Sequence, residues 1–169
     1  MWYVIWTLTG KEEELIAQVR KSVPEEKYEQ IWTPYKEWIK KSNGCREIRR
    51  SLIFPGYVFV NTDDPQTIHT MIKKERSCLG FLKSDGEFVQ VREDEKKIIE
   101  FFMGDKGVAG VSLCLLENNR LKVIDGPLKG MDDRIYRLER SKNQVWVRLP
   151  NMFGRDWELS FAVEIVERE

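Results

Sequence analysis

The sequence predicts an α+β protein in two parts, an α/β sandwich domain followed by a small five-stranded β-barrel. Helical and strand patterns alternate through residues 1–103. Three glycines within the seven residues 104–110 are typical of a linker. Beyond them lie only short strand patterns separated by turn residues, as in small barrels. We therefore expect a first domain at 1–103, a flexible linker at 104–116 and a barrel domain at 117–169.

The first domain is expected to open with a central strand, because residues 2–8 are apolar on both alternating faces. A helix follows at 11–23 and ends before Pro24. Thr9 and Glu12 have the spacing of a capping box, in which each side chain bonds an unpaired amide at the helix start. The apolar residues of the helix recur at helical spacing: Leu15, Ile16, Val19 and Val23.

A β-hairpin and a buried strand are predicted next. Extended stretches at 28–38 and 47–54 flank Asn43-Gly44, the strongest short hairpin signal. Pro55-Gly56 then makes a turn, and residues 57–60 form a strand that is apolar throughout.

A second helix is predicted after Asp63-Asp64-Pro65, which supply an N-cap and a proline at the first helical position. Its inner face is expected to carry Ile68, Met71 and Ile72. Short strands at 79–82 and 87–91 around a turn at 84–86 follow, and a third helix at 94–103 completes the domain.

The barrel is predicted from five short strands, at 121–124, 134–138, 144–149, 157–161 and 163–166. In the third of them, period two buries the aliphatic residues and turns Trp146 and Arg148 outward. An outward aromatic beside arginine suits folded RNA, because phosphates need cations and unstacked bases need a flat surface. The alternative is that Trp146 closes one end of the barrel while the arginines are simply solvated.

Composition and charge limit the classes of function. The 169 residues carry 28 basic and 28 acidic side chains, which excludes a uniformly basic nucleic-acid coat and an acidic tail protein. Charged residues make up 33% and apolar residues 41%, the balance of a soluble globular chain. No apolar run reaches the roughly 20 residues of a membrane helix. We expect a cytoplasmic protein with no membrane partner.

No pattern of catalytic or metal-binding residues is present. Cys45, Cys78 and Cys114 are odd in number and widely separated, and His69 is the only histidine. No nucleophile, phosphate-loop or dinucleotide motif occurs. The sequence therefore predicts a protein that is not an enzyme and that binds no metal or cofactor.

Basic residues gather in two segments despite the overall neutrality. Residues 36–50 carry an excess of four positive charges, and residues 120–155 an excess of five. Such segments are candidate contacts for nucleic acid. The hairpin candidates are Lys40, Lys41, Arg46, Arg49 and Arg50. The candidate RNA-binding residues of the barrel are Lys122, Lys129, Arg134, Arg137, Arg140, Lys142, Trp146, Arg148 and Arg155.

The segment 54–60, Phe-Pro-Gly-Tyr-Val-Phe-Val, carries a second candidate site. Period two points Tyr57 and Phe59 to one face of the strand and the two valines to the core. Trp6 lies on the matching face of the first strand. We expect these three rings to form an apolar depression that suits a partner helix.

In this order, the motifs resemble the NusG family of transcription elongation factors over essentially the whole chain. The residues that carry the resemblance are Trp2-Tyr3-Val4-Ile5-Trp6, Gly10-Lys11-Glu12-Glu13, segment 54–60 and Gly126-Pro127-Leu128-Lys129-Gly130. The resemblance implies a NusG amino-terminal-type domain that binds the clamp helices of bacterial RNA polymerase. It also implies a KOW-type barrel that binds RNA, a ribosomal protein or a termination factor. Asp133 is a departure, since many KOW motifs carry glycine there.

Within the family the sequence is most similar to the specialised paralogue LoaP, and RfaH is second. The similarity to LoaP rests on residues 7–14, 46–50 and 121–128, and implies processive antitermination with recognition of an RNA hairpin in the leader transcript. The similarity to RfaH rests on Asp64-Pro65 and His69-Thr70, and implies that His69 and Thr70 touch the opposite side of the polymerase cleft. The alternative for His69 is a solvated helix residue.

The expected function is that of a monomeric processive antiterminator that bridges the polymerase cleft and suppresses pausing and termination. The resemblance implies these polymerase-binding residues: Trp6, Phe54, Tyr57, Phe59, His69 and Thr70. One alternative is a general NusG-like adaptor whose barrel binds a ribosomal or termination protein. Another is an RfaH-like factor that reads exposed DNA and refolds its barrel. Gly130, Pro150 and Gly154 argue against refolding into helices.

Overall fold

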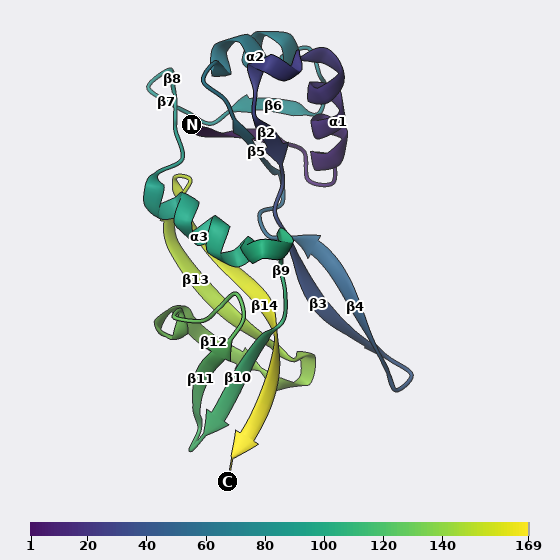
Figure 1. Cartoon of the computed structure of the whole chain (residues 1–169), viewed down its shortest axis with the longest axis vertical. Coiled ribbons are helices and arrows are strands. Elements are labelled where there is room, and N and C mark those ends of the chain that lie inside the picture. The colour runs from purple at the N-terminus through teal and green to yellow at the C-terminus, as the bar shows by residue number, and fades with distance from the viewer. Residues whose placement is uncertain (169) are drawn as a thin grey trace. The chain divides into compact units, whose positions relative to one another are not determined.

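The computed structural model describes residues 1–168 and divides the chain into two compact units (Figure 1). The first unit comprises residues 1–33 and 54–96, and the second comprises residues 34–53 and the chain from Lys97 onward. The structure confirms the predicted α+β class. It places the hairpin in the same unit as the barrel, whereas the sequence assigned it to the first domain.

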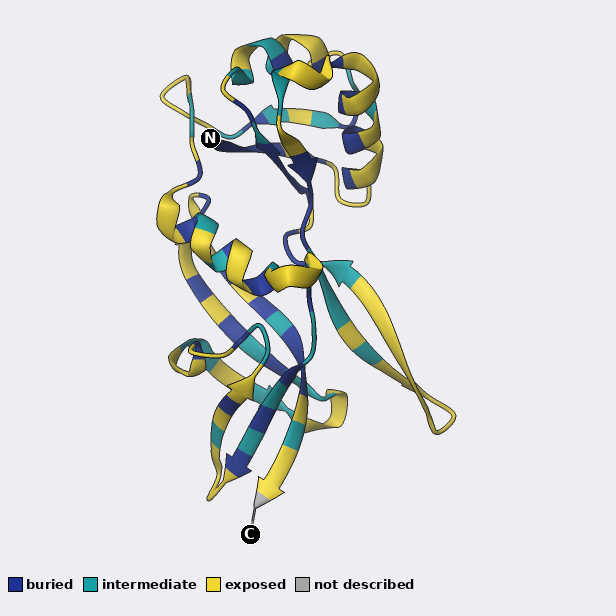
Figure 2. Cartoon of the chain, in the orientation of Figure 1, coloured by how far each residue is buried: buried dark blue, intermediate teal, exposed yellow. Residues whose placement is uncertain are grey.

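The first unit is built on a four-stranded sheet with the order β2-β5-β1-β6. Its strands are β1 (Trp2–Thr7), β2 (Gln30–Trp32), β5 (Tyr57–Asn61) and β6 (Cys78–Phe81). The central pair, β1 and β5, is antiparallel and buried along most of its length (Figure 2). Both strands were predicted from residues that are apolar on both faces, and both predictions are confirmed.

Helices α1 (Glu12–Ser22) and α2 (Pro65–Ile72) pack on one face of this sheet. The sheet and helix residues that form the core are Tyr3, Ile5, Leu15, Ile16, Val19, Val23, Ile31, Val58, Val60, Ile68, Ile72 and Phe81. The inward stripe of α2 was predicted correctly for Ile68 and Ile72 but not for Met71, which is 40% exposed. The half-buried His69 packs against Phe81, so the buried face of α2 includes His69 rather than Met71.

The start of α1 differs from the predicted capping box. Lys11 occupies the N-cap without a side-chain hydrogen bond. The Glu12 carboxylate is buried and accepts hydrogen bonds from the backbone N–H of Gly10 at 2.9 Å and of Gly56 at 2.7 Å. The Gly56 amide is 44 residues away in sequence, so no local motif predicts this contact. In a capping box, the Glu12 carboxylate would accept a hydrogen bond from a nearby amide at the helix start; here it accepts the tertiary hydrogen bond from Gly56 instead.

Asp64 caps α2 as predicted and accepts a hydrogen bond from the Thr67 amide at 3.1 Å. The other elements that lie wholly in the first unit are η1 (Glu25–Lys27), β7 (Lys83–Ser84) and β8 (Glu87–Phe88), and α3 (Glu93–Met103) runs from the first unit into the second. No helix in the described part of the chain is long and apolar enough to cross a membrane.

The second unit contains a five-stranded sheet with the order β11-β10-β14-β13-β12. Its strands are β10 (Ser112–Glu117), β11 (Arg120–Asp125), β12 (Ile135–Glu139), β13 (Gln144–Met152) and β14 (Arg155–Arg168). The predicted strands 157–161 and 163–166 are one strand, β14. This strand pairs with β13 up to Ala162 and with β10 from Val163, so the chain changes partner there without a break.

The predicted linker range, 104–116, contains more regular structure than expected. It includes η2 (Gly104–Lys106), β9 (Val108–Ala109) and all but the last residue of β10. Ser112, Cys114 and Leu116 alternate inward along β10 and are buried. The barrel therefore begins at Ser112 rather than at residue 117.

The hairpin consists of β3 (Tyr35–Ser42) and β4 (Cys45–Leu52), and β9 pairs with the edge of β3 opposite β4. Its predicted turn is confirmed, because Asn43 and Gly44 have φ angles of 49° and 78°, the positive values that a type I′ turn needs. Lys36 on β3 joins the hairpin to the barrel: its ammonium donates to the Ser160 carbonyl and lies 5.4 Å from the centre of the Phe161 ring. Burial lowers the pKa of Lys36 from 10.5 to about 8.

The Lys36 contact predicts a rise of stability with pH. Between pH 8 and 10.5 the folded chain holds Lys36 neutral while the unfolded chain keeps it protonated. Because the unfolded state then binds more protons, the free energy of unfolding increases across this window, by up to about 3 kcal/mol. Urea unfolding below and above the window should show that the free energy of unfolding rises more in the wild type than in Lys36→Met, because the opposite contribution of Cys114, whose pKa burial raises to about 11, is common to both. The exposed-lysine control Lys106→Met should behave as the wild type, and an equal rise in Lys36→Met contradicts the assignment.

Candidate functional site

The sheet face opposite α1 and α2 carries the predicted aromatic cluster. Trp6 and Tyr57 are cross-strand partners, and their ring centres lie 6.2 Å apart. Trp6 is 38% exposed, whereas Tyr57 is 8% exposed. Trp6 therefore supplies most of the accessible surface of this pair.

The two phenylalanines of the cluster are fully buried. Phe59 lies 6.1 Å from Phe54 and stacks on Trp32 at 5.8 Å. Trp32 was not among the predicted site residues. Its strand lies in a stretch that the sequence predicts to be extended, but the register that places it opposite Phe59 is a tertiary feature. The structure thus brings Trp6, Tyr57, Phe54 and Phe59 onto one face, and only Trp6 is widely accessible.

The turn before β5 is attached to β1, the strand that carries Trp6. The Gly56 carbonyl accepts a hydrogen bond from the Thr7 amide at 2.9 Å, and its amide is held by Glu12. Gly56 has a φ of +84°, and a Cβ there would lie 3.1 Å from the Thr7 carbonyl oxygen. Glycine is therefore needed where the two strands of the cluster begin to pair.

His69 and Thr70 lie on α2, which packs on the other face of the sheet. The His69 ring contacts the edges of Phe81 and Phe88, with centres 6.0 and 5.7 Å away. Its Nδ1 is buried and has no hydrogen-bond partner among the described residues. Burial first, and then the charge of nearby lysines, lowers the pKa of His69. His69 is thus half-buried rather than a solvated helix residue, while Thr70 is exposed.

Five of the nine predicted RNA-binding residues gather on β12, β13 and the η4 turn (Arg140–Lys142) between them. They are Arg137, Arg140, Lys142, Trp146 and Arg148. The Arg137 guanidinium lies 5.6 Å from the centre of the Trp146 ring, and that of Arg148 lies 4.4 Å from the centre of the Tyr136 ring. We call Tyr136, Arg137, Lys142, Trp146 and Arg148 the Trp146 face.

Tyr136 was not predicted as a site residue, because a register shift in β12 changes which residues lie beside it. The pairing of β12 with β13 shifts between residues 135 and 137, and the bulge brings Tyr136 beside Arg148. Tyr136 is 40% exposed. Because of the bulge, two aromatic rings lie on this surface where the sequence predicted one, and each ring contacts an arginine.

Glu139 holds the Trp146 face together. It accepts hydrogen bonds from Gln144 at 2.7 Å and Trp146 at 3.2 Å, and pairs with Lys142 at 3.0 Å. The hydrogen bonds from Gln144, Lys142 and Trp146 lower the pKa of Glu139 to about 2. At neutral pH the Glu139 carboxylate is ionised, and its hydrogen bond fixes the position of the Trp146 N–H edge. One face of the Trp146 ring then lies against Arg137.

The remaining four barrel candidates lie outside this face. Lys122 is on β11, at the opposite end of the strand order, and Lys129 lies in the turn that follows. Arg134 is in η3 (Asp132–Arg134), and the Arg155 guanidinium stacks 3.9 Å from the centre of the Trp157 ring.

Acidic residues from outside residues 120–155 lie beside this segment in the fold and offset part of its positive charge. Arg148 pairs with Glu158 at 3.2 Å, and Arg140 pairs with Glu167 at 2.9 Å. Both acids come from β14, after the basic segment. These pairs are more than half exposed, and such pairs stabilise a fold by only about 0–1 kcal/mol. A phosphate can therefore replace the carboxylates at low cost.

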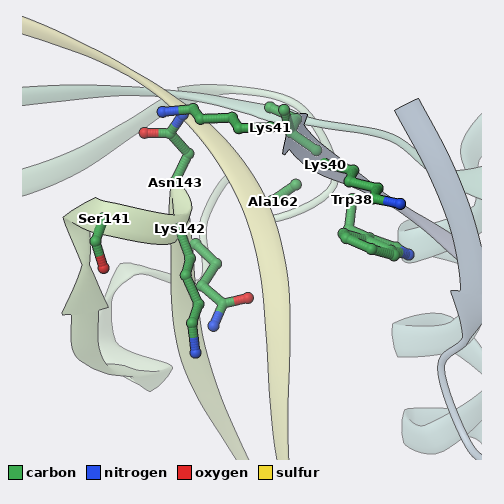
Figure 3. A pocket seen from close by; sticks show the side chains of 9 residues that line it. Trp38, Lys40, Lys41, Ser141, Lys142, Asn143 and Ala162 are labelled. Atoms are coloured by element: carbon green, nitrogen blue, oxygen red, sulfur yellow. The ribbon is translucent and has the colours of Figure 1, made fainter. Parts of the chain in front are cut away.

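The hairpin candidates are all exposed, and three of them, Lys40, Lys41 and Arg46, lie next to barrel residues. Arg46 pairs with Glu164 at 3.3 Å and Arg49 with Glu47 at 3.0 Å. Lys40 and Lys41 line a cavity of about 390 Å³ together with Lys142 of η4. In Figure 3, Trp38 and Lys40 lie on one side of it, Lys142 and Asn143 on the other. We call this space the lysine cavity; its walls are Trp38, Ile39, Lys40, Lys41, Ser141, Lys142, Asn143, Gln144 and Ala162.

The described residues contain no group of three or more His, Cys, Asp or Glu side chains placed to hold a metal ion. The cysteines are separate as well: Cys45 is exposed, Cys78 is half-buried and Cys114 is buried.

Comparison with known proteins gives a consistent family. The family model described as "Transcription termination factor nusG" matches residues 1–100. The transcription termination/antitermination protein NusG of Bacillus subtilis is 30% identical over 174 residues, which cover 95% of each chain. The corresponding protein of Thermus thermophilus is 25% identical over 176 residues, again with 95% of each chain covered.

A solved structure has a similar fold. The structure described as "Domain interaction in Thermotoga maritima NusG" aligns with a TM-score of 0.60 and 20% identity, and the alignment covers 95% of this chain and 92% of that one. The alignment extends through both units and shows a similar fold.

Proposed function

The chain belongs to the NusG family of transcription factors, and on this basis we propose that it is a processive antiterminator of the specialised kind that LoaP represents. The first unit binds RNA polymerase, and the barrel binds a hairpin in the leader RNA. Binding to the RNA recruits the factor to its own transcripts, and binding to the polymerase suppresses pausing and termination downstream.

Polymerase docking is assigned to the aromatic cluster of the first unit. Trp6 is an exposed aromatic on a rigid, buried strand pair, the type of side chain that dominates the binding energy of interfaces. Tyr57 packs against it, and the buried Phe54 and Phe59 lie on the same face of the sheet. His69 and Thr70 on α2 form the second contact, with the other side of the polymerase cleft. By binding both sides, the protein favours the closed polymerase by as much as its affinity for the two states differs.

The observation that carries the RNA assignment is the Trp146 face. It combines the half-buried ring of Trp146 and the exposed ring of Tyr136, each covered by an arginine, with Lys142. Arginine and aromatic planes stack on unpaired bases, and the cationic groups neutralise phosphates.

Single-round transcription through an intrinsic terminator tests the proposal. A bacterial polymerase is assayed with and without the protein, on templates with and without a structured leader. We expect readthrough that requires both the protein and the leader. Readthrough that is indifferent to the leader contradicts RNA recruitment, and added termination contradicts antitermination.

A second function is favoured by the relatives, which are described as transcription termination/antitermination proteins. In this alternative the barrel binds a ribosomal or termination protein, and the factor acts on all transcripts. The two functions differ in the barrel's ligand, so a salt-dependent gel shift with leader RNA separates them.

A further inference from the structure

We propose that the lysine cavity binds one unpaired nucleotide of the RNA held by the Trp146 face, with its base stacked on Trp38 and its phosphates between Lys40, Lys41 and Lys142. The inference rests on the proposed RNA binding of the barrel and adds a second contact that selects looped RNA over plain duplex. Every residue of the site belongs to the second unit.

The size and walls of the cavity suit one nucleotide. Its volume of about 390 Å³ falls in the range of small-ligand sites, which is about 300–1,000 Å³. Trp38 is 40% exposed on β3, so its ring offers an accessible flat surface. Ala162 forms part of the wall and has a short side chain, which leaves room beside the indole (Figure 3). Ser141 and Gln144 add hydroxyl and amide groups that can bond to the edge of a base.

The charge of the cavity points to phosphate. Glu47, the cross-strand partner of Lys40, pairs with Arg49 instead, and Glu164 pairs with Arg46. Among the residues that the structure describes, no ion pair involves Lys40 or Lys41. Lys142 pairs with Glu139 and keeps 66% of its side chain exposed. Two ammonium groups that make no ion pair, and a third that pairs with Glu139, therefore surround a site that contains an accessible indole.

The hairpin side of the cavity is fixed to the barrel side. With the Asn143 amide turned so that its nitrogen donates to the Arg140 carbonyl, its oxygen accepts a hydrogen bond from Lys41 at 2.9 Å. Lys36 attaches the same strand to Ser160 and Phe161. Since these contacts already hold β3 on the barrel, a nucleotide does not have to order the hairpin when it binds.

RNA is the favoured ligand because the cavity is continuous with the Trp146 face. Lys142 belongs to both, and Gln144 of the cavity donates to Glu139, which also holds the Trp146 indole. A base that leaves the stem of a hairpin bound on that face reaches the cavity over a short path. A plain duplex has no unpaired base to insert.

Fluorescence anisotropy with two labelled probes tests the site. One probe is an RNA stem-loop with a loop of six uridines, and the other is the same stem as a blunt duplex. For the full-length wild type we expect tighter binding of the stem-loop, by about tenfold or more. Trp38→Ala should remove this preference and leave duplex binding unchanged, while Trp38→Phe should keep most of it. Lys40→Gln with Lys41→Gln should lower the salt dependence of stem-loop binding by about two phosphate contacts.

Matched variants separate this site from the proposed function. Arg20→Gln with Lys21→Gln, at exposed positions at the end of α1, should bind as the wild type. Trp146→Ala with Arg148→Ala should weaken both probes. If Trp38→Ala keeps the stem-loop preference, the cavity assignment is overturned and the proposed function stands. If the wild type binds neither probe at low salt, RNA recruitment fails and the inference fails with it. If a DNA stem-loop binds as tightly as the RNA stem-loop and its binding also depends on Trp38, the assignment to RNA is overturned. If Trp38→Ala loses only polymerase binding, the cavity contacts a protein and the nucleotide assignment is overturned.

Discussion

Replacing Gly126 with alanine is expected to lower the stability of the second unit by about 3 kcal/mol or more. Gly126 has a φ of +100°, a conformation that L side chains rarely adopt. A Cβ at this position would also lie 2.7 Å from the Ser112 Cα. That neighbour is backbone of β10, a strand inside the sheet, so it cannot move aside as the end of a flexible side chain would.

The Ser112 contact explains why this turn tolerates no side chain. Ser112 is fully buried, and its hydroxyl accepts a hydrogen bond from the Leu128 amide at 3.1 Å. Leu128 is itself fully buried. The turn after β11 therefore packs closely against β10. One added methyl group would disrupt both this packing and the hydrogen bond between Leu128 and Ser112.

Gly130→Ala is the matched control for this prediction. Gly130 also has a positive φ, +82°, but a Cβ there would meet nothing within 4 Å. Its substitution should cost only the backbone strain, about 1 kcal/mol. Urea unfolding followed by tryptophan fluorescence measures both variants in the full chain. Equal losses in the two would mean that the close approach to Ser112 contributes nothing.

Much of the fold is predictable because its signals are local. Asn43-Gly44 predicts a type I′ hairpin, and Asp64-Pro65 predicts a helix start, because each residue type suits the backbone angles or the free amides at that point. The differences arise where distant segments meet. Glu12 binds the Gly56 amide instead of capping its helix in a box, and β14 is continuous because it changes partner from β13 to β10.

The candidate sites are predictable in composition but not in exposure. Period two places Tyr57 and Phe59 on one face correctly, yet it carries no information about what covers that face, and Phe59 is fully buried. The same limit applies to charge. The basic excess of residues 120–155 is opposed by Glu158 and Glu167, which follow in the sequence but lie beside Arg148 and Arg140. The hairpin and barrel candidates were predicted separately, and only the tertiary structure brings Lys40 and Lys41 to Lys142.

Separate losses of polymerase and RNA binding are the second large effect that we expect. Trp6→Ala should weaken binding to purified bacterial RNA polymerase by about 30-fold or more, since truncation of a central aromatic anchor costs about 2 kcal/mol or more. It should leave binding of the uridine stem-loop unchanged. Trp6 is a better choice than Tyr57 because Tyr57 is nearly buried, and its truncation would leave a cavity that destabilises the unit.

Trp146→Ala with Arg148→Ala should have the opposite result: stem-loop binding weaker by about 30-fold or more, and polymerase binding unchanged. The controls are exposed residues outside both sites, Arg20→Gln with Lys21→Gln in the first unit and Ile124→Ala in the second. Pull-down of polymerase and anisotropy with RNA measure the two activities on the same preparations. Because the two sites lie in different compact units, loss of both activities in either variant would contradict the division of labour, provided that its unfolding curve matches that of its control.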